Sequence, residues 1–309
     1  MTWRQKALLQ HLVAMLPRRL SYAAHYYLQR RSGGLRGVDE RHRLQAGLDL
    51  IECIAASGRP AAGGTFLEVG TGDHINTPLV LWLAGAARIT TVDLNPYLRG
   101  DLVISELAYV REHLDETRSL FRKTPGGALN EDRLAHLGRL ALKFPSLLDE
   151  LSTRYIAPAD AARVPLPDGC IDFHISYAVL QHIPPQTLRG ILLEARRLLK
   201  PGGLGIHWID MSDHFSHGDH SISPVNFLQF SDREWRKLAG NRFMYQNRMR
   251  VDDYIMLLGE IGATVRCVDA HVNERALRAL ADGLRLDPQF AGKEMRTNAT
   301  TNAWITFSF

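Results

Sequence analysis

The sequence predicts an α/β fold in which helices cover both faces of a doubly wound, mostly parallel sheet. From residue 64 onward, short apolar runs rich in Val, Ile and Phe alternate with stretches of helical periodicity. The expected strands are 65–69, 88–93, 153–158, 171–176, 203–209, 263–270 and 302–308. Strands separated by helices imply right-handed crossovers, which align neighbouring strands in parallel. A glycine-rich turn ends the first run and an acid ends the second, as in nucleoside-binding sheets.

Composition sets wide limits on the protein. A chain of 309 residues that is 45% hydrophobic has ample material for one large domain, with or without additions. A formal charge of +4 excludes neither nucleic acid nor an acidic substrate. Cys53, Cys170 and Cys267 are scattered and form no CxxC pair, so the sequence indicates neither a disulfide framework nor a zinc cluster. A reducing cytoplasm is the expected location.

Residues 1–62 are expected to form a helical N-terminal cap before the sheet begins. Its first helix is predicted to be amphipathic, with Leu9, Leu12, Val13 and Leu16 on one face. Residues 1–50 carry nine Lys or Arg, among them Arg18, Arg19, Arg30 and Arg31, against three acids. This basic segment is either a solvated helical face or a patch for peripheral contact with anionic lipid or a phosphorylated substrate. No segment approaches the length of a membrane span.

Two intervals between strands are too long for plain connections. Residues 97–150 contain helical periodicity, and residues 211–250 mix aromatic, amide and basic side chains without a clear period. Long excursions from the carboxyl ends of parallel strands usually build a lid or the substrate side of a pocket. We therefore expect both insertions, within a main domain of residues 63–309, to form a substrate lid.

The turn after the first strand points to a cationic cofactor. It contains Glu68, Gly70 and Gly72, whereas the third glycine of a dinucleotide-binding turn is replaced by Ile75. A carboxylate inside the turn is a poor neighbour for a pyrophosphate. S-adenosylmethionine, which carries an ammonium and a sulfonium, suits it better.

From about residue 64 to residue 309, the chain resembles the class I S-adenosylmethionine-dependent methyltransferases of bacterial small-molecule and glycan pathways. Glu68-x-Gly70-x-Gly72 resembles the first motif of that family, although Asp73-His74 stands where many members have small residues. The segments 158–161, 166–172, 176–184 and 199–203 resemble later family motifs in the same order. The resemblance implies a seven-stranded sheet whose last strand is antiparallel.

The resemblance also implies roles for individual residues. In the family, the acid after the second strand, here Asp93, accepts hydrogen bonds from both ribose hydroxyls. Asp160 is expected to face the adenine amino group, Ala161 leaves room for the ring, and the segment from Ser176 flanks the methionine portion. The cofactor-binding residues implied in this way are Glu68, Gly70, Thr71, Gly72, Asp93, Leu94, Asp160, Ala161, Ser176 and Tyr177. Asp93 and Asp160 are also suited to cap a helix or a turn.

Modification of nucleic-acid bases is disfavoured. The tripeptide Asn95-Pro96-Tyr97 is similar to a motif of methyltransferases that act on exocyclic amines of bases. In those enzymes the motif follows the fourth strand, whereas here it follows the second and lacks a second proline. No nucleic-acid partner is therefore expected.

Four of the thirteen histidines lie between residues 207 and 220, at the end of the fifth strand. The carboxyl end of such a strand faces the substrate, and a hydroxyl acceptor needs a base to take its proton. Asp213 and His214 are the first candidate pair for this base, and His182 is the second. These side chains are equally suited to organising the loop. A divalent ion held by His207, Asp210, Asp213, His214 and His217 is a weaker alternative, because neighbours in a loop rarely converge on one metal.

The sequence thus predicts a methyltransferase that uses S-adenosylmethionine and O-methylates a small polyhydroxylated or sugar-containing metabolite. Aromatic, amide and Arg side chains at 226–231 and 241–248 suit sugar rings, and equally suit packing between lid and sheet. An N- or C-methyltransferase of a natural product, and a non-catalytic scaffold of the same fold, remain alternatives. The acceptor, the use of a metal and a homodimeric state are left open.

Overall fold

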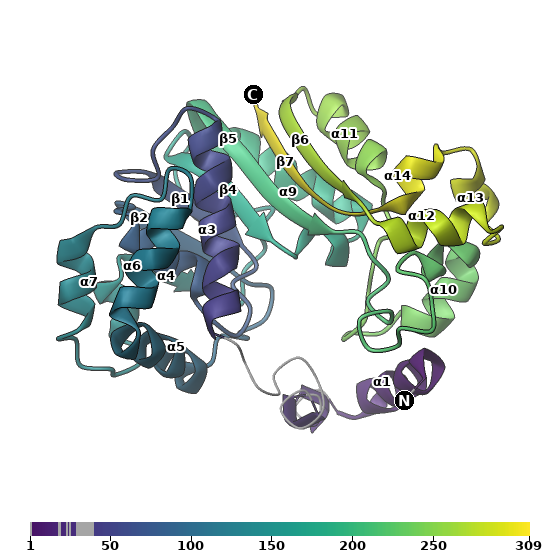
Figure 1. Ribbon diagram of the computed structural model, residues 1–309, viewed down its shortest axis with the longest axis horizontal. Helices are drawn as coiled ribbons and strands as arrows, with labels where there is room; N and C mark the ends of the chain where they lie inside the picture. Colours follow the sequence, from purple (N-terminus) through teal and green to yellow (C-terminus); the bar gives the residue numbers. More distant parts are fainter. Residues whose placement is uncertain (1, 18–19, 23, 25, 29–39) are drawn as a thin grey trace.

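The computed structural model describes residues 2–17, 20–22, 24, 26–28 and 40–309 (Figure 1). Within them lies a seven-stranded sheet in the order β3-β2-β1-β4-β5-β7-β6. The strands are β1 Thr65–Val69, β2 Arg88–Val92, β3 Thr153–Ile156, β4 Ile171–Tyr177, β5 Leu199–Asp210, β6 Thr264–Val272 and β7 Thr300–Ser308. Each predicted strand is present. β5 begins earlier than predicted, because Leu199 already pairs with Ile171 before the strand irregularity at the Gly-rich turn.

The pairing confirms the predicted sheet. β1 pairs in parallel with β2 and β4, β2 with β3, and β4 with β5. The last strand, β7, runs antiparallel between β5 and β6. β7 has partners along both edges, and most of its residues are buried in the apolar clusters on the faces of the sheet. The carboxyl ends of β1, β2, β4 and β5 consequently meet along one edge, called the carboxyl edge below.

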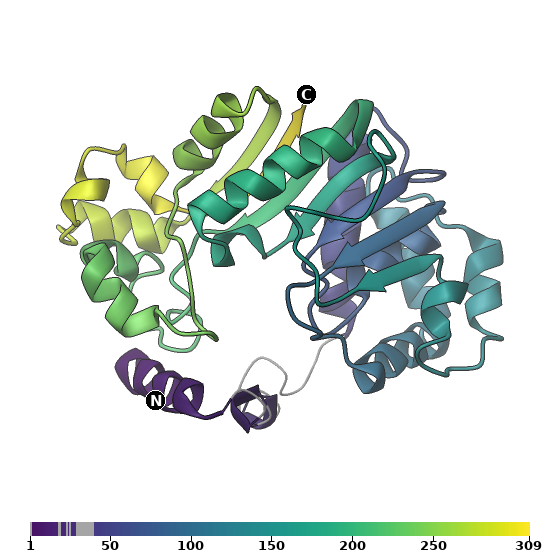
Figure 2. The ribbon, with the colours of Figure 1, turned by 180° about the vertical axis from the view of Figure 1, so that it is seen from behind.

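Helices cover both faces of the sheet. α3 (Glu40–Ala56), α4 (Asn76–Leu83) and α5 (Gly100–Glu112) lie on the face turned toward the viewer in Figure 1. α9 (Pro185–Leu198) and α11 (Val251–Glu260) cover the other face, which is seen in Figure 2. Nearly every side chain of α4 is buried, since this helix lies between the sheet, α3 and the helices that follow β2.

The insertion predicted at residues 97–150 contains α5, α6 (Leu114–Lys123), α7 (Glu131–Leu137) and α8 (Leu147–Glu150). α7 packs against α4 through Leu134 and Leu137, which are fully buried. Arg133 donates from Nη1 to the carbonyls of Trp82 and Ala86 at the C-terminal end of α4, at 2.7 and 2.8 Å. That end lies away from the carboxyl edge, because α4 runs antiparallel to the strand it follows. α7 therefore extends the core rather than covering the carboxyl edge.

A second apolar cluster lies beside the sheet and joins the N-terminal helix to segments that follow β5 and β6. It contains α1 (Trp3–Met15), the short helix η2 (Asn226–Gln229), α10 (Asp232–Ala239) and the helices α12 (Glu274–Ala281), α13 (Pro288–Ala291) and α14 (Met295–Ala299). At its centre, Trp3 contacts Phe215 with ring centroids 5.6 Å apart, and Phe215 contacts Trp235. The predicted single apolar face of the first helix is wrong: Val13 is buried, whereas Leu9, Leu12 and Leu16 are exposed.

Residues 20–22, which follow α1, reach across the carboxyl edge. The ring of Tyr22 lies 6.0 Å from that of Tyr97, which follows β2, and 5.4 Å from that of Phe243, which follows α10. Arg242 donates from Nη1 to Ser21 Oγ at 3.2 Å. The basic residues Arg18, Arg19, Arg30 and Arg31 lie outside the described residues. In the described part of the chain, no helix is both long and apolar enough to cross a membrane.

Candidate functional site

The turn after β1 fits tightly against the loop after β4. Gly70 has φ +83°, a conformation that L side chains rarely adopt. A Cβ at this position would lie 2.5 Å from Val179 Cγ2, so the residue must be glycine for a second reason. Gly72 also has a positive φ, of +73°, but open space lies beside it. The turn thus brings backbone close to two strand ends and leaves room next to Gly72.

Glu68 is buried beneath this turn. Its Oε2 accepts a hydrogen bond of 2.6 Å from Thr91 Oγ1, and the same hydroxyl contacts that of Thr71. Burial raises the pKa of Glu68 to about 8, which the hydrogen bonds from Thr91 and Thr77 only partly offset. A carboxylate at this position is therefore unstable in its charged form unless a cation lies nearby.

Asp93, at the end of β2, is the second buried carboxylate of the turn. Its Oδ2 accepts hydrogen bonds from the amide of Gly72 at 3.1 Å and from Tyr155 Oη at 3.3 Å. Burial raises the pKa of Asp93 to about 7 despite these contacts. None of the groups that shift the pKa of Glu68 or Asp93 most is a cation.

These residues fit S-adenosylmethionine. Two buried carboxylates without a cationic neighbour favour a ligand that brings positive charge, and this cofactor carries an ammonium and a sulfonium. The open space beside Gly72 lets a ligand approach the backbone closely. Asp93 lies beside this space, with its Oδ2 bonded to the amide of Gly72.

The Glu68→Gln variant is expected to be more stable than the wild type at pH 8 without cofactor, by up to about 4 kcal/mol. The folded pKa of Glu68 lies above its ordinary value, so this carboxyl lowers the free energy of unfolding as pH rises from about 5 to about 8. Glutamine removes that loss and keeps an oxygen for Thr91. Chemical denaturation at several pH values would show the gain. An equal loss of stability at pH 5 and pH 8 would contradict it, and weaker binding of S-adenosylmethionine is expected alongside.

The other predicted cofactor residues near β2 and β3 lie around Asp93. Leu94 follows it and is 73% exposed. The amide of Ala159 donates to the carbonyl of Asp93 at 2.8 Å, which ties the loop after β3 to the end of β2. In that loop, Asp160 Oδ1 accepts from the amide of Ala162 at 2.9 Å and so caps its own turn, while Ala161 is half-buried. Asp160 therefore has a local structural role in this loop.

Ser176 and Tyr177 lie on opposite faces at the end of β4. Ser176 is buried, and its Oγ lies 2.7 Å from His207 Nδ1. His207 Nε2 lies 3.3 Å from His174 Nδ1, which forms a buried chain of polar groups between β4 and β5. Tyr177 instead stacks on Trp208 with ring centroids 4.5 Å apart. The side chain of Ser176 is therefore engaged inside the protein, which leaves its backbone for contact with a cofactor.

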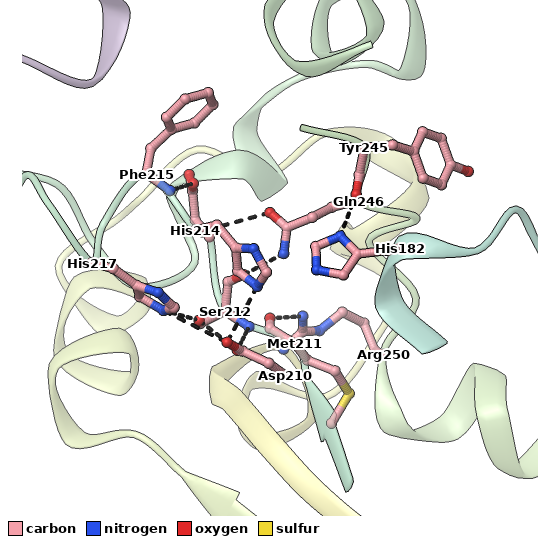
Figure 3. A network of polar contacts seen from close by, with 11 residues as sticks. His182, Asp210, Met211, Ser212, His214, Phe215, His217, Tyr245, Gln246 and Arg250 are labelled. Atoms are coloured by element: carbon pink, nitrogen blue, oxygen red, sulfur yellow. Dashed lines mark hydrogen bonds and ion pairs between the residues drawn. The ribbon is translucent and has the colours of Figure 1, made fainter. Parts of the chain in front are cut away.

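A cluster of histidines surrounds Asp210 at the end of β5 (Figure 3). His214 Nε2 lies 3.2 Å from Asp210 Oδ2, and His217 Nε2 lies 3.7 Å from the same oxygen. Ser212 donates to Asp210 Oδ1 from its amide at 2.9 Å and from Oγ at 2.6 Å. Burial alone would raise the pKa of Asp210, but the contacts with His214 and Ser212 hold it below its ordinary value. Asp210 is thus a stable anion in contact with His214.

The structure corrects the predicted pairing of Asp213 with His214. Asp213 is fully buried, and its carboxylate accepts from the amide of Phe215 at 2.9 Å and from Asn226 Nδ2 at 3.2 Å. It therefore holds the loop together, and burial raises its pKa to about 6. The partner of His214 is Asp210, four residues earlier. The signal for Asp210 was present in the sequence, because an acid that ends a strand is what singled out Asp93.

His182 lies beside this cluster. Its ring is T-shaped against that of His214, with centroids 5.0 Å apart, and its Nδ1 lies 2.7 Å from the carbonyl of Tyr245 (Figure 3). The surrounding protein and the neighbouring His214 lower the pKa of His182. His182 follows Val179, which packs on Gly70, so the histidine cluster is connected to the cofactor turn through one short loop.

The segment 245–250 fixes both loops of the site, a function that sequence analysis did not detect. Gln246 donates from Nε2 to the carbonyl of Ser212 at 2.8 Å and accepts from the amide of His214. Asn247 donates from Nδ2 to the carbonyls of Leu180 and Ile183, at 2.9 and 3.0 Å. These amides therefore organise backbone, instead of lining a sugar site as their composition allowed. Among the described residues, no three His, Cys, Asp or Glu side chains are arranged to hold a metal ion.

Comparison with known proteins finds a matching domain model and similar folds. Residues 144–206, from just before β3 to the middle of β5, match the model of a family described as a methyltransferase domain. No curated protein matches the chain. Among solved structures, the PH0226 protein of Pyrococcus horikoshii OT3 is similar, with a TM-score of 0.51 and 13% identity over 92% of this chain and 98% of that one.

A methyltransferase of Mesorhizobium loti, described as S-adenosylmethionine dependent, aligns with a TM-score of 0.46 and 13% identity over 84% of this chain and 99% of that one. At 13% identity, the likeness to the PH0226 protein concerns the fold alone. The domain match, the order of the strands and the Glu68–Gly72 turn all indicate a methyltransferase. The chain is therefore an enzyme with a methyltransferase domain, and S-adenosylmethionine is its cofactor.

Proposed function

We propose that the enzyme transfers a methyl group to a hydroxyl oxygen of a small polyhydroxylated or sugar-containing metabolite, with His214 as the general base. The observation that carries this proposal is the contact between His214 and Asp210 at the end of β5. A hydroxyl acceptor must lose its proton as the methyl group arrives, and a histidine oriented by a carboxylate is suited to take it.

The contact with Asp210 also selects the reactive nitrogen of His214. When Nε2 carries the proton and faces Asp210, Nδ1 is the unprotonated nitrogen that can accept a proton. His182, although its side chain is exposed, favours its neutral form, because the surrounding protein and the neighbouring His214 lower its pKa. It therefore shapes the site without adding a competing positive charge.

The cofactor supplies the methyl group when it is bound. The residues of this chain contribute its position: Glu68 and Asp93 provide the negative charge that a cationic ligand requires, and Gly70 keeps the turn against Val179. Methyl transfer is an in-line displacement, so alignment of acceptor and donor supplies much of the rate. Residues 20–22, which contact both sides of the carboxyl edge, help to exclude water there.

The face of β5 and β7 beside Asp210 supports a polyhydroxylated acceptor. Trp208 lies two residues before Asp210 and therefore on the same face of the sheet, where it pairs with Trp304 of β7. Both rings are half-buried. Partly exposed aromatic rings next to a carboxylate, and to Asn302, which pairs with Asp210, suit a sugar ring and its hydroxyls.

The His214→Ala variant is expected to lower kcat about 100-fold, while its affinity for S-adenosylhomocysteine stays at the wild-type level. The assay follows transfer of labelled methyl from S-adenosylmethionine to a panel of sugars, glycosides and polyols. His220→Ala is the matched control, since His220 belongs to the same loop but its side chain is exposed. The kcat of Asp210→Asn should lie between those of His214→Ala and His220→Ala.

Two results would count against the proposal in different ways. If His214→Ala keeps the wild-type rate on an acceptor that the enzyme methylates, no base is required there, and transfer to nitrogen or carbon becomes the better explanation. If the folded enzyme does not bind S-adenosylhomocysteine in calorimetric titration, the cofactor assignment itself fails.

A further inference from the structure

The N-terminal helix α1 has a second apolar face that no described residue covers. Trp3, Ala7 and Val13 point inward and are buried. On the other side, Leu8, Leu12 and Met15 are 62%, 55% and 81% exposed, and Leu9 and Leu16 flank them. A surface helix normally carries one apolar stripe. We name this outward set, Leu8, Leu9, Leu12, Met15 and Leu16, the outer face of α1.

The outer face is not an ordinary scatter of exposed apolar residues. In a helix, positions 8, 12 and 15 lie above one another, so these side chains form one continuous stripe. Leu20 and Tyr27, which follow in the chain, are also 60% and 58% exposed. Most large exposed hydrophobic residues of the described part of the chain therefore belong to this N-terminal segment. A contiguous apolar surface of this kind marks a site that binds another protein or a membrane.

The charge of the N-terminal sequence indicates the kind of partner. Residues 1–38 include Arg4, Lys6 and five further arginines but no Asp or Glu. Arg4 is exposed at the margin of the outer face, whereas Lys6 points toward Phe215. An apolar stripe in a purely basic segment fits an anionic membrane surface. A second copy of this chain fits less well, because two acid-free segments would repel each other.

We propose that the outer face of α1 binds the surface of an anionic lipid bilayer. The proposal concerns a site apart from the methyl-transfer site and holds whichever acceptor the enzyme uses. In both ribbon views, α1 lies beyond the carboxyl edge and not beyond the opposite edge of the sheet (Figures 1 and 2). Its inner face is tied to the catalytic loop, because the amide of Trp3 donates to Asp219 Oδ2 at 2.8 Å. A bound bilayer would therefore lie near the loop that carries His214.

The test is cosedimentation of the full chain with vesicles of phosphatidylcholine alone or mixed with phosphatidylglycerol. The wild type should bind only the mixed vesicles, and about 0.5 M salt should weaken the binding. Met15→Glu should lower the partition coefficient at least about tenfold, because it places a charge in the lipid-facing stripe. Met256→Glu, at an exposed methionine of α11, is the matched control and should bind like the wild type.

Separate measurements keep the result interpretable. Met15→Glu should retain the wild-type melting temperature and affinity for S-adenosylhomocysteine, which shows that lost vesicle binding is not lost folding. Equal binding of Met15→Glu and the wild type to mixed vesicles would overturn the proposal. The proposal would also be overturned if the wild type bound neither kind of vesicle but formed a dimer in light scattering, and if Met15→Glu dissociated that dimer. The outer face would then bind a second copy of the chain.

Discussion

Gly70→Ala is expected to abolish measurable binding of S-adenosylhomocysteine and to destabilise the fold by about 3 kcal/mol. Two physical effects add at this position. At φ +83°, an alanine is strained by about 1–2 kcal/mol. Its Cβ would also meet Val179 Cγ2 at 2.5 Å, so the loop after β4 has to move away. Because the cofactor turn and the loop that leads to His182 meet at this contact, both lose their position.

Two further variants separate these effects. Gly169→Ala has a comparable strain, at φ +56°, but its Cβ would meet no atom within 4 Å, and it lies in a different loop. It should lose only about 1–2 kcal/mol and keep its affinity for S-adenosylhomocysteine. The double variant Gly70→Ala/Val179→Ala removes the steric conflict and should regain part of the binding. If it binds no better than Gly70→Ala, the contact with Val179 is not what fixes the turn. Calorimetry and thermal denaturation provide both readouts.

The fold could be predicted from the sequence because its signals are local. An apolar run such as 65–69 can be buried on both faces only in a sheet covered by helices, and its glycine turn marks the carboxyl edge. The helices α12, α13 and α14 between β6 and β7 were not predicted. Besides Val272 at the end of β6, their apolar residues pack into the cluster around Trp3 and Phe215, and a local sequence pattern does not identify partners so distant along the chain.

Some residues of the candidate site could likewise be predicted from local sequence signals, and others could not. Asp93 was singled out by its place at the end of a strand, and the structure places it against the amide of Gly72 in the turn after β1. The contact of His214 with Asp210 was not predicted, because Asp213 is adjacent to His214 in the sequence. In the structure, the loop turns the Asp213 carboxylate inward toward Asn226. Which of two acids faces a histidine depends on loop conformation. In this loop, conformation depends on Gln246, which is more than thirty residues away.

Arg250→Met is expected to lower the free energy of unfolding by about 3 kcal/mol and to lower kcat more strongly than it weakens cofactor binding. Arg250 is fully buried. It donates from Nη1 to the carbonyl of Met211 at 2.7 Å, and from Nη2 to the carbonyls of Asn298, at 3.1 Å, and Thr300. Methionine fills similar space but leaves these buried carbonyls without their donor. Relief of the buried charge, whose pKa burial lowers to about 10, offsets part of the loss.

The catalytic effect follows from the position of Met211 between Asp210 and Ser212. Arg250 ties this residue to the beginning of β7, so it fixes the strand end on which the carboxylate of Asp210 stands. Arg233→Met, at an exposed arginine of α10, controls for the loss of one positive charge and should match the wild type. Arg250→Lys keeps the charge, but a single ammonium does not reach carbonyls on both strands as a guanidinium does, so an intermediate loss is expected. Denaturation and single-turnover rates measure the two effects. An Arg250→Met enzyme that is less stable yet equally fast would show that β7 supports the fold without positioning Asp210.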